Sequence, residues 1–141
     1  MKLKFAAALL IFAVGYTKAQ EIRGANGSVL GTIKPDGEVR GANGSVVGYF
    51  RQDGDIRGAN NSKIGSIRPD GEIRGANNSK VGLLRPDGEV RAANNTALGI
   101  ITQNGDVRSA KGSMVCHATN VRKEWVAAAV FFFFFDRQSP K

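Results

Sequence analysis

The chain has 141 residues and a formal net charge of +8, from 20 basic and 12 acidic residues. This length is enough for one small domain. Acidic and basic residues are interleaved along the chain, which argues against a nucleic-acid-binding polycation. The single cysteine, Cys116, rules out a disulfide within the chain, so we expect packing to hold the fold together.

The first nineteen residues are typical of a secretory signal peptide. A short basic start precedes an apolar run, Phe5–Val14, that is too short to span a bilayer comfortably. Small residues follow at Thr17 and Ala19, and they suit a cleavage site after Ala19. A signal anchor is the alternative. We therefore expect an exported protein whose mature chain begins at Gln20.

A 17-residue repeat fills most of the remaining chain, and its positions are numbered here from Glu21 as position 1. A repeat of this length suits two short strands and two turns, whereas its Gly and Asn content would break helices. An incomplete sixth copy covers Asp106–Ala118. Five complete copies cover 21–37, 38–54, 55–71, 72–88 and 89–105.

The end of each complete copy predicts a hairpin turn. Positions 15–17 read Pro-Asp-Gly or a close relative, which suits a type I turn followed by a left-handed glycine. This turn sets apolar position 13 opposite apolar position 2 of the next copy. It also sets position 14 opposite position 1, where opposite charges meet, as in Lys34 and Glu38.

A second turn is predicted at Ala25-Asn26-Gly27 and the equivalent residues. It sets position 2 opposite position 10. Positions 10 and 13 have opposite parity in a regular strand, so we expect a bulge or sharp bend at the position-11 glycines. We interpret five Asn-x-Ser/Thr triplets as turns rather than glycosylation sites. They begin at Asn26, Asn43, Asn60, Asn77 and Asn94.

Such hairpins form a meander with two free edges, which favour aggregation. Closing the meander into a ring removes both edges. Glu21–Gly24 would begin this ring, and Met114–Ala118 would complete it by lying beside the start. An open solenoid is the alternative.

The C-terminal segment, 119–141, departs from the repeat. Its eleven apolar residues, Trp125–Phe135, are too few for a transmembrane helix. In an α-helix, consecutive Phe residues about 100° apart would cover every face, so such a helix must be surrounded. We expect it inside the ring; a buried final strand and an exposed, membrane-dipping tail are the alternatives. The predicted organisation is a signal peptide (1–19), a hairpin repeat domain (20–118) and a packed C-terminal segment (119–141).

Units such as "DGEIRGANNSKVGLLRP", the signal peptide and the ending "VRKEWVAAAVFFFFFD" resemble the five-fold β-flower proteins of Gram-negative bacteria. The resemblance implies an all-β, closed ring of antiparallel hairpins with pseudo-five-fold symmetry around the C-terminal helix. It also implies a location in the periplasm or on the outer cell surface, and it implies no activity. Two features depart from the pattern: the sixth copy, and Cys116 in place of the position-11 glycine.

Arginine occupies position 3 in every copy, which makes this column the candidate ligand-binding site. A ring of guanidinium groups could hold carboxylate, phosphate or sulfate. The preferred interpretation is a surface ladder in which these arginines alternate with the acids at position 1. The column consists of Arg23, Arg40, Arg57, Arg74, Arg91 and Arg108.

Nothing in the sequence predicts catalysis, a cofactor or a metal site. Cys116 and the single histidine, His117, are adjacent, so on a strand they would point to opposite faces. The turn acids, such as Asp36, supply too few oxygens for calcium.

Two non-catalytic functions remain. The first is a structural or interaction module of the cell envelope that docks on a protein partner. The second is a lectin-like module that binds glycans or other anionic ligands. Identical glycan sites should share contact residues with an aromatic in each, but positions 9 and 12 vary and hold one aromatic, Tyr49. This variation favours protein docking; we expect neither a nucleic-acid partner nor a transmembrane span.

Overall fold

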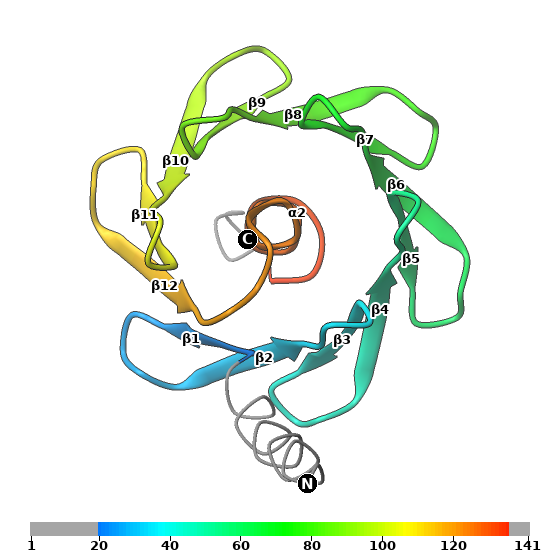
Figure 1. Ribbon diagram of the computed structural model, residues 1–141, viewed down its shortest axis with the longest axis horizontal. Helices are drawn as coiled ribbons and strands as arrows, with labels where there is room; N and C mark the ends of the chain where they lie inside the picture. The colour runs from blue at the N-terminus through cyan, green and yellow to red at the C-terminus, as the bar shows by residue number, and fades with distance from the viewer. Residues whose placement is uncertain (1–19, 136–141) are drawn as a thin grey trace, which may run out of the picture.

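The computed structural model describes residues 20–135, where twelve short strands form a closed ring and one helix, α2 (Lys123–Phe131), lies along its axis (Figure 1). Each strand pairs antiparallel with its neighbours in the chain, and β12 pairs with β1 to close the ring. The strands are β1 (Glu21–Gly24), β2 (Val29–Ile33), β3 (Glu38–Gly41), β4 (Val46–Phe50), β5 (Asp55–Gly58), β6 (Lys63–Ile67), β7 (Glu72–Gly75), β8 (Lys80–Leu84), β9 (Glu89–Ala92), β10 (Ala97–Ile101), β11 (Asp106–Ser109) and β12 (Met114–Ala118).

The expected closed ring of hairpins around a C-terminal helix is confirmed, and the alternative of an open solenoid is wrong. The count differs from the expected pseudo-five-fold arrangement, because the ring contains six hairpins. The incomplete sixth copy forms the full hairpin β11–β12. It lacks only the turn that would lead into a further hairpin, and β12 meets β1 instead. The predicted signal peptide, 1–19, lies outside the described residues.

The turns that connect successive hairpins have the predicted register. Ile33 faces Val39 across the β2–β3 pair, and the amide of Lys34 donates to the carbonyl of Glu38 at 2.9 Å. Gly37 ends the turn with a φ of +98°, a backbone conformation that side chains other than glycine rarely adopt. The turn chemistry at positions 15–17 is therefore sufficient to set this pairing.

Inside each hairpin the register differs from the prediction by one residue. Ile22 faces Gly31 rather than Leu30, and Arg23 faces Val29, so Leu30 is the extra residue of a bulge. The bulge precedes the glycine instead of coinciding with it. The extra residue shifts the parity between positions 9 and 11, so position 11 faces position 2. Gly31 and Ile33, two residues apart on β2, then both face the interior, where they are buried.

The position-11 glycines make room for the phenylalanine run. A Cβ atom added at Gly65 would lie 2.5 Å from Cζ of Phe133, and one at Gly31 would lie 2.6 Å from Cζ of Phe135. Each of the five glycines faces the phenyl group of a different phenylalanine in this way. The pairs are Gly99 with Phe131, Gly82 with Phe132, Gly65 with Phe133, Gly48 with Phe134 and Gly31 with Phe135.

The backbone after α2 opens into a wider coil than an α-helix. The amides of Phe133 and Phe134 donate to carbonyls five residues back, those of Ala128 and Ala129, at 2.9 and 3.1 Å. Such bonds add residues to each turn. Successive phenylalanine side chains therefore contact successive hairpins, which lie one sixth of the hairpin ring apart. In an α-helix, successive side chains would instead point about 100° apart. In Figure 1 this coil curves around the end of α2.

The helix itself fills the centre of the ring. Ala127, Ala128 and Ala129 are fully buried, and Trp125 stacks on Phe50 with ring centroids 5.4 Å apart. The buried final strand and the exposed tail are thus excluded for residues 123–131. Within the described residues no helix has the length and apolar character needed to cross a membrane. The position-2 residues surround the helix and are all completely buried: Ile22, Val39, Ile56, Ile73, Val90 and Val107.

The glycine–phenylalanine contact can be tested by Gly65→Ala, with Gly58→Ala as the matched control in the same hairpin. The added methyl at Gly65 would collide with Phe133 and with the Arg74 carbonyl oxygen, which lies 2.6 Å away. We expect a loss of about 1–3 kcal/mol in the free energy of unfolding, the usual cost of overpacking a core. At Gly58 the nearest atoms are 3.6 Å away, so the change should stay within about 0.5 kcal/mol. Urea unfolding measures both, and equal effects would contradict the packing described here.

Candidate functional site

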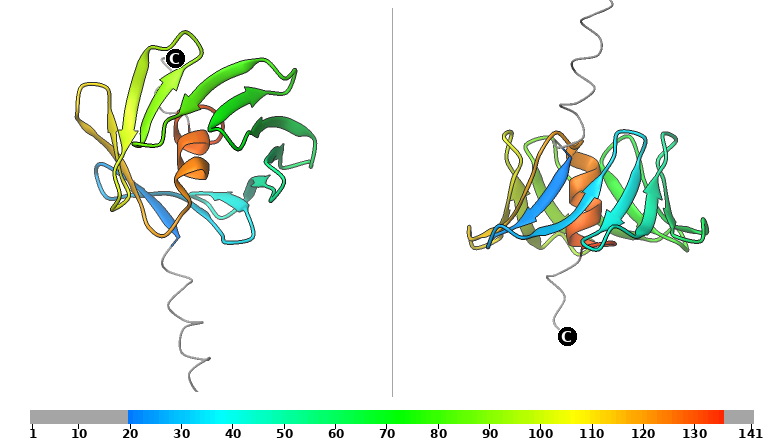
Figure 2. Two further views of the ribbon diagram at one scale, coloured as in Figure 1. Left: turned by 45° about the horizontal axis from the view of Figure 1, so that its top comes forward. Right: turned by 90° about the horizontal axis from the view of Figure 1, so that it is seen from below.

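The two ends of the ring differ (Figure 2). The turn face carries the turns at positions 15–17 and the start of α2. The loop face carries the loops at positions 5–8, which flare outward, and the phenylalanine coil 131–135. The wall between the two faces is formed by the strands.

The six position-3 arginines lie one per hairpin around the wall, and the structure does not gather them into one pocket. Each donates from Nη1 to a carbonyl of the loop in its own hairpin; for Arg74 the acceptor is Asn78, at 2.6 Å. Its Nη2 also lies 2.7 Å from Oε1 of Glu72, the acid at position 1. The loop acceptors are Gly27, Gly44, Asn61, Asn78, Asn95 and Gly112.

These contacts fit the surface ladder that the sequence favours. The position-14 cations extend it, since Lys34 and Arg85 lie 3.5 and 3.7 Å from the acids at Glu38 and Glu89. Each arginine also ties down a loop whose seventh position has a positive φ, +73° at Asn78. A ligand would therefore compete with existing partners, and the binding of anions by this column stays a prediction.

The turn acids and loop amides are engaged in their own turns. Asp36 Oδ1 accepts the amide of Glu38 at 3.0 Å, and Asn26 Oδ1 accepts that of Ser28 at 3.1 Å. The same contacts recur in the other copies with Asp or Asn at these positions. Among the described residues, no group of three or more His, Cys, Asp or Glu side chains is placed to hold a metal ion.

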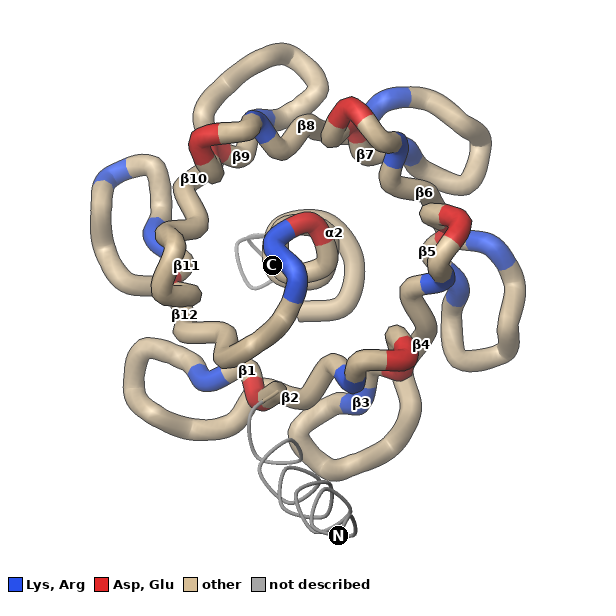
Figure 3. The backbone as a smooth tube through the Cα atoms, viewed as in Figure 1, with Lys and Arg blue, Asp and Glu red and all other residues tan. Residues whose placement is uncertain are grey.

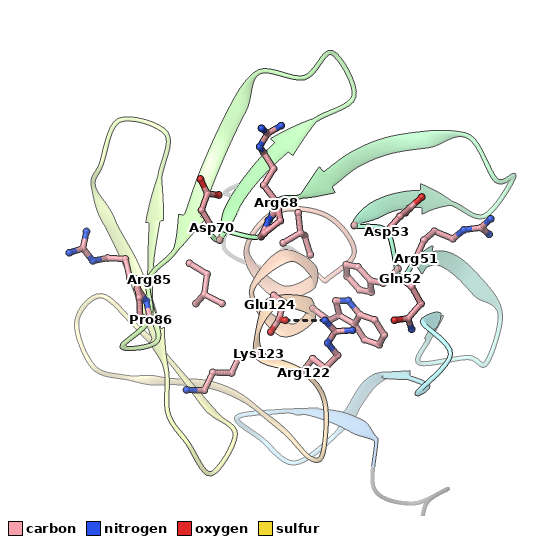
Figure 4. A pocket seen from close by; sticks show the side chains of 17 residues that line it. Arg51, Gln52, Asp53, Arg68, Asp70, Arg85, Pro86, Arg122, Lys123 and Glu124 are labelled. Atoms are coloured by element: carbon pink, nitrogen blue, oxygen red, sulfur yellow. Dashed lines mark hydrogen bonds and ion pairs between the residues drawn. The ribbon is translucent and has the colours of Figure 1, made fainter.

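A cleft of about 430 Å³ opens on the turn face, beside the start of α2 (Figure 4). Three turns and residues 122–125 line it. Trp125 leans against Phe50 on one side. On the other side Ile67 and Leu84 remain partly exposed, although their counterparts elsewhere in the ring, Ile33 and Ile101, are buried. One tryptophan thus fills one sector of the ring and leaves the next sector open.

The rim of this cleft is charged and its floor is apolar. Arg122 lies over the Trp125 ring, 4.7 Å from its centroid, and pairs with Glu124 at 3.2 Å. Five cations and three acids line the cleft. Arg51, Arg68 and Arg85 point away from the helix, so their alkyl stems and the turn backbone form the rim (Figure 4).

The turn face has a second, different hollow of about 410 Å³. The β10–β11 turn (102–105) and residues 118–121 line it with uncharged side chains, and Lys123 is the charged residue in its lining. The six-fold repetition is therefore lost at this end of the ring. Sequence reasoning missed both hollows, because the repeat gives no sign of where a single helix leaves space.

Cys116 and His117 lie on opposite sides of β12. Cys116 faces the core, where burial raises the pKa of its thiol to about 12. His117 faces outward, and its Nδ1 lies 2.8 Å from Oδ1 of Asp106. The two side chains therefore do not form a Cys–His dyad.

The buried thiol predicts a loss of stability at high pH. The ordinary pKa of the thiol, 9.0, applies to the unfolded chain, so between pH 9 and 12 the unfolded chain releases a proton that the folded protein keeps. The free energy of unfolding should then fall by about 1.4 kcal/mol per pH unit above pH 9, and the full stability should be present below it. Urea unfolding of the wild type and of Cys116→Ala from pH 7 to 10.5 isolates this effect. A constant difference between the two proteins across that range would be evidence against it.

The ladder interpretation predicts unequal costs for replacing an arginine at position 3 and an arginine at position 14. Arg74→Gln removes the bond to Asn78 and the close pair with Glu72, and should lower the free energy of unfolding by about 1–2 kcal/mol. The Arg85 side chain is 46% exposed, and its Nε lies 3.7 Å from Oε1 of Glu89. Arg85→Gln should therefore lower the free energy of unfolding by less than about 0.5 kcal/mol. If Arg74→Gln leaves thermal unfolding unchanged, the structural role assigned to this column is wrong.

Comparison with known proteins agrees with this architecture. A family model described as "5-fold beta-flower protein" matches residues 19–136. Neither a curated protein nor a solved structure matches the chain. The ring of this chain has six hairpins, and five of them contribute a glycine–phenylalanine pair. Because the match covers all of residues 20–135, the chain belongs to the 5-fold beta-flower protein family.

Proposed function

We propose that this chain is an exported, non-catalytic module of the cell envelope that docks on a protein partner through its turn face. The observation that carries the proposal is the cleft beside Trp125, which breaks the repetition of the hairpins in the part of the chain that the structure describes. Repeated ligands favour repeated sites, because several equivalent contacts give avidity. A single asymmetric cleft instead suits one partner in one orientation.

The chemistry of the cleft supports a protein ligand. Its floor offers partly exposed aliphatic carbon at Ile67 and Leu84, and its rim carries arginines around this floor. An apolar anchor surrounded by polar contacts is the usual organisation of a protein interface. Arginine is also enriched at such interfaces, since its planar guanidinium forms directed hydrogen bonds.

The glycan-binding alternative has less support from the geometry. It would use the position-3 arginines, each of which already donates to its own loop carbonyl. The stacking that sugars favour would need an exposed aromatic in every hairpin. Position 12 on the wall holds one aromatic residue, Tyr49, and otherwise varies.

Export is part of this proposal and rests on the signal-peptide pattern of residues 1–19. It predicts that the protein isolated from cells begins at Gln20, which mass spectrometry of the N-terminal peptide would detect. A chain that retains residues 1–19 in cells would contradict export without bearing on the cleft.

The docking site can be tested by placing a photo-crosslinking residue at Gln52, with Gln103 as the matched control. Both are exposed and occupy position 15 of a connecting turn, but Gln52 lines the proposed cleft and Gln103 lines the second hollow. After irradiation of cells, we expect an adduct with one discrete protein from position 52 and none from position 103. No adduct at position 52, or polysaccharide adducts at both positions, would contradict protein docking at the cleft.

A further inference from the structure

Charge is distributed unequally between the two ends of the ring. Positions 4–13 contain no aspartate or glutamate in any of the six copies, so none of the flared loops carries an acidic side chain. The same positions contribute three lysines, at Lys63, Lys80 and Lys111. Figure 3 shows that acidic residues lie near the inner ring and the turns, whereas the charged residues on the outer parts of the hairpins are basic.

The lysines are only loosely held. Lys63 Nζ lies 3.5 Å from Oδ1 of Asp55, and Lys80 Nζ lies 3.9 Å from Oε2 of Glu72. Their side chains are 48% and 39% exposed, and exposed pairs of this kind contribute little. Lys111 makes no ion pair among the described residues. All three ammonium groups are therefore available to an anionic surface without disturbing the fold.

The centre of the loop face is aromatic. Phe132, Phe133 and Phe134 are partly exposed, whereas Phe131 and Phe135 are buried. The wide coil holds their rings against the glycines of three adjacent hairpins at this end of the ring. Residues 136–141, which follow, lie outside the described residues and contain one acidic and two basic side chains.

We propose that the loop face binds peripherally to a membrane surface that contains anionic lipids. Lysines outside an aromatic centre suit such a surface, because basic side chains are attracted to anionic headgroups and aromatic rings favour the interface. A soluble polyanion would use the lysines but not the partly exposed phenylalanines. A second copy of the chain is disfavoured as the occupant, because two acid-free, cationic loop faces would repel each other.

This inference concerns the end of the ring opposite the cleft, so it stands independently of the proposed docking on a protein. Together the two would let one rigid ring bind a partner while it rests on lipid. The two faces are separated by the length of the strands, and each can be altered without touching the other.

The test uses the chain from Gln20 to Lys141, in which the closed ring is complete and the apolar run Phe5–Val14 cannot itself bind lipid. Sedimentation with vesicles of phosphatidylcholine and phosphatidylglycerol in a two-to-one ratio measures binding. The triple variant Lys63→Gln, Lys80→Gln, Lys111→Gln should bind at least about tenfold more weakly, since each basic residue near such a surface contributes to attraction. The control carries the same loss of charge on the turn face: Lys34→Gln, Arg51→Gln and Arg85→Gln.

The control should bind as the wild type does, and pure phosphatidylcholine vesicles should bind neither protein strongly. Equal weakening by both triple variants would overturn the assignment to the loop face. Absence of binding to the anionic vesicles would overturn the proposal, and binding to soluble dextran sulfate without binding to vesicles would point to a polyanionic ligand instead.

Orientation on the membrane gives a second measurement. The only tryptophan, Trp125, lines the cleft on the turn face, so brominated lipids should not quench the wild-type fluorescence. Ala76→Trp places an indole on an exposed loop of the loop face and should be quenched. Quenching of Trp125 in the wild type equal to that of the Ala76→Trp variant would show the opposite orientation and overturn the proposal.

Discussion

Contact between five phenylalanine side chains and five glycines holds the ring of hairpins around its central helix, α2. A side chain at any of these glycines would occupy the space that a phenyl group fills, as the positions of Phe133 and Gly65 show. The same glycines face a carbonyl of the neighbouring hairpin closely, so the absence of a side chain lets both the strands and the rings approach. Burial of the rings then supplies stabilisation that a chain without internal disulfides needs.

The coil that delivers these rings departs from α-helical geometry for a clear reason. In an α-helix, consecutive residues would point about 100° apart, and they would miss consecutive hairpins in a six-hairpin ring. Hydrogen bonds to carbonyls five residues back widen the turn after Ala129, so each ring advances by one hairpin. The sixth hairpin lacks this arrangement, since Cys116 occupies position 11 there and its thiol is buried instead.

Repetition and asymmetry have separate origins in this protein. The hairpins repeat because each copy has the same turns, the same inward aliphatic residues and the same arginine bracing its loop. The helix does not repeat, so Trp125 fills one sector and leaves a cleft in another. A ring built from equal parts thereby acquires one distinct surface on the turn face, while the loop face keeps its acid-free loops all around. This difference between the faces is the basis for assigning them different partners.

The sequence by itself determined the strands, the register of the connecting turns and the inward face, because these depend on local residue types. The Pro-Asp-Gly turns fix which residues pair, as at Ile33 and Val39, and apolar position 2 must be buried. The sequence also indicated that the phenylalanine run needs to be surrounded. Tertiary structure alone decided that six hairpins close the ring, that the bulge lies at Leu30, and that the coil after α2 widens. It also decided where the cleft opens. These features depend on how volumes fit around a shared axis, and no single 17-residue unit contains that information.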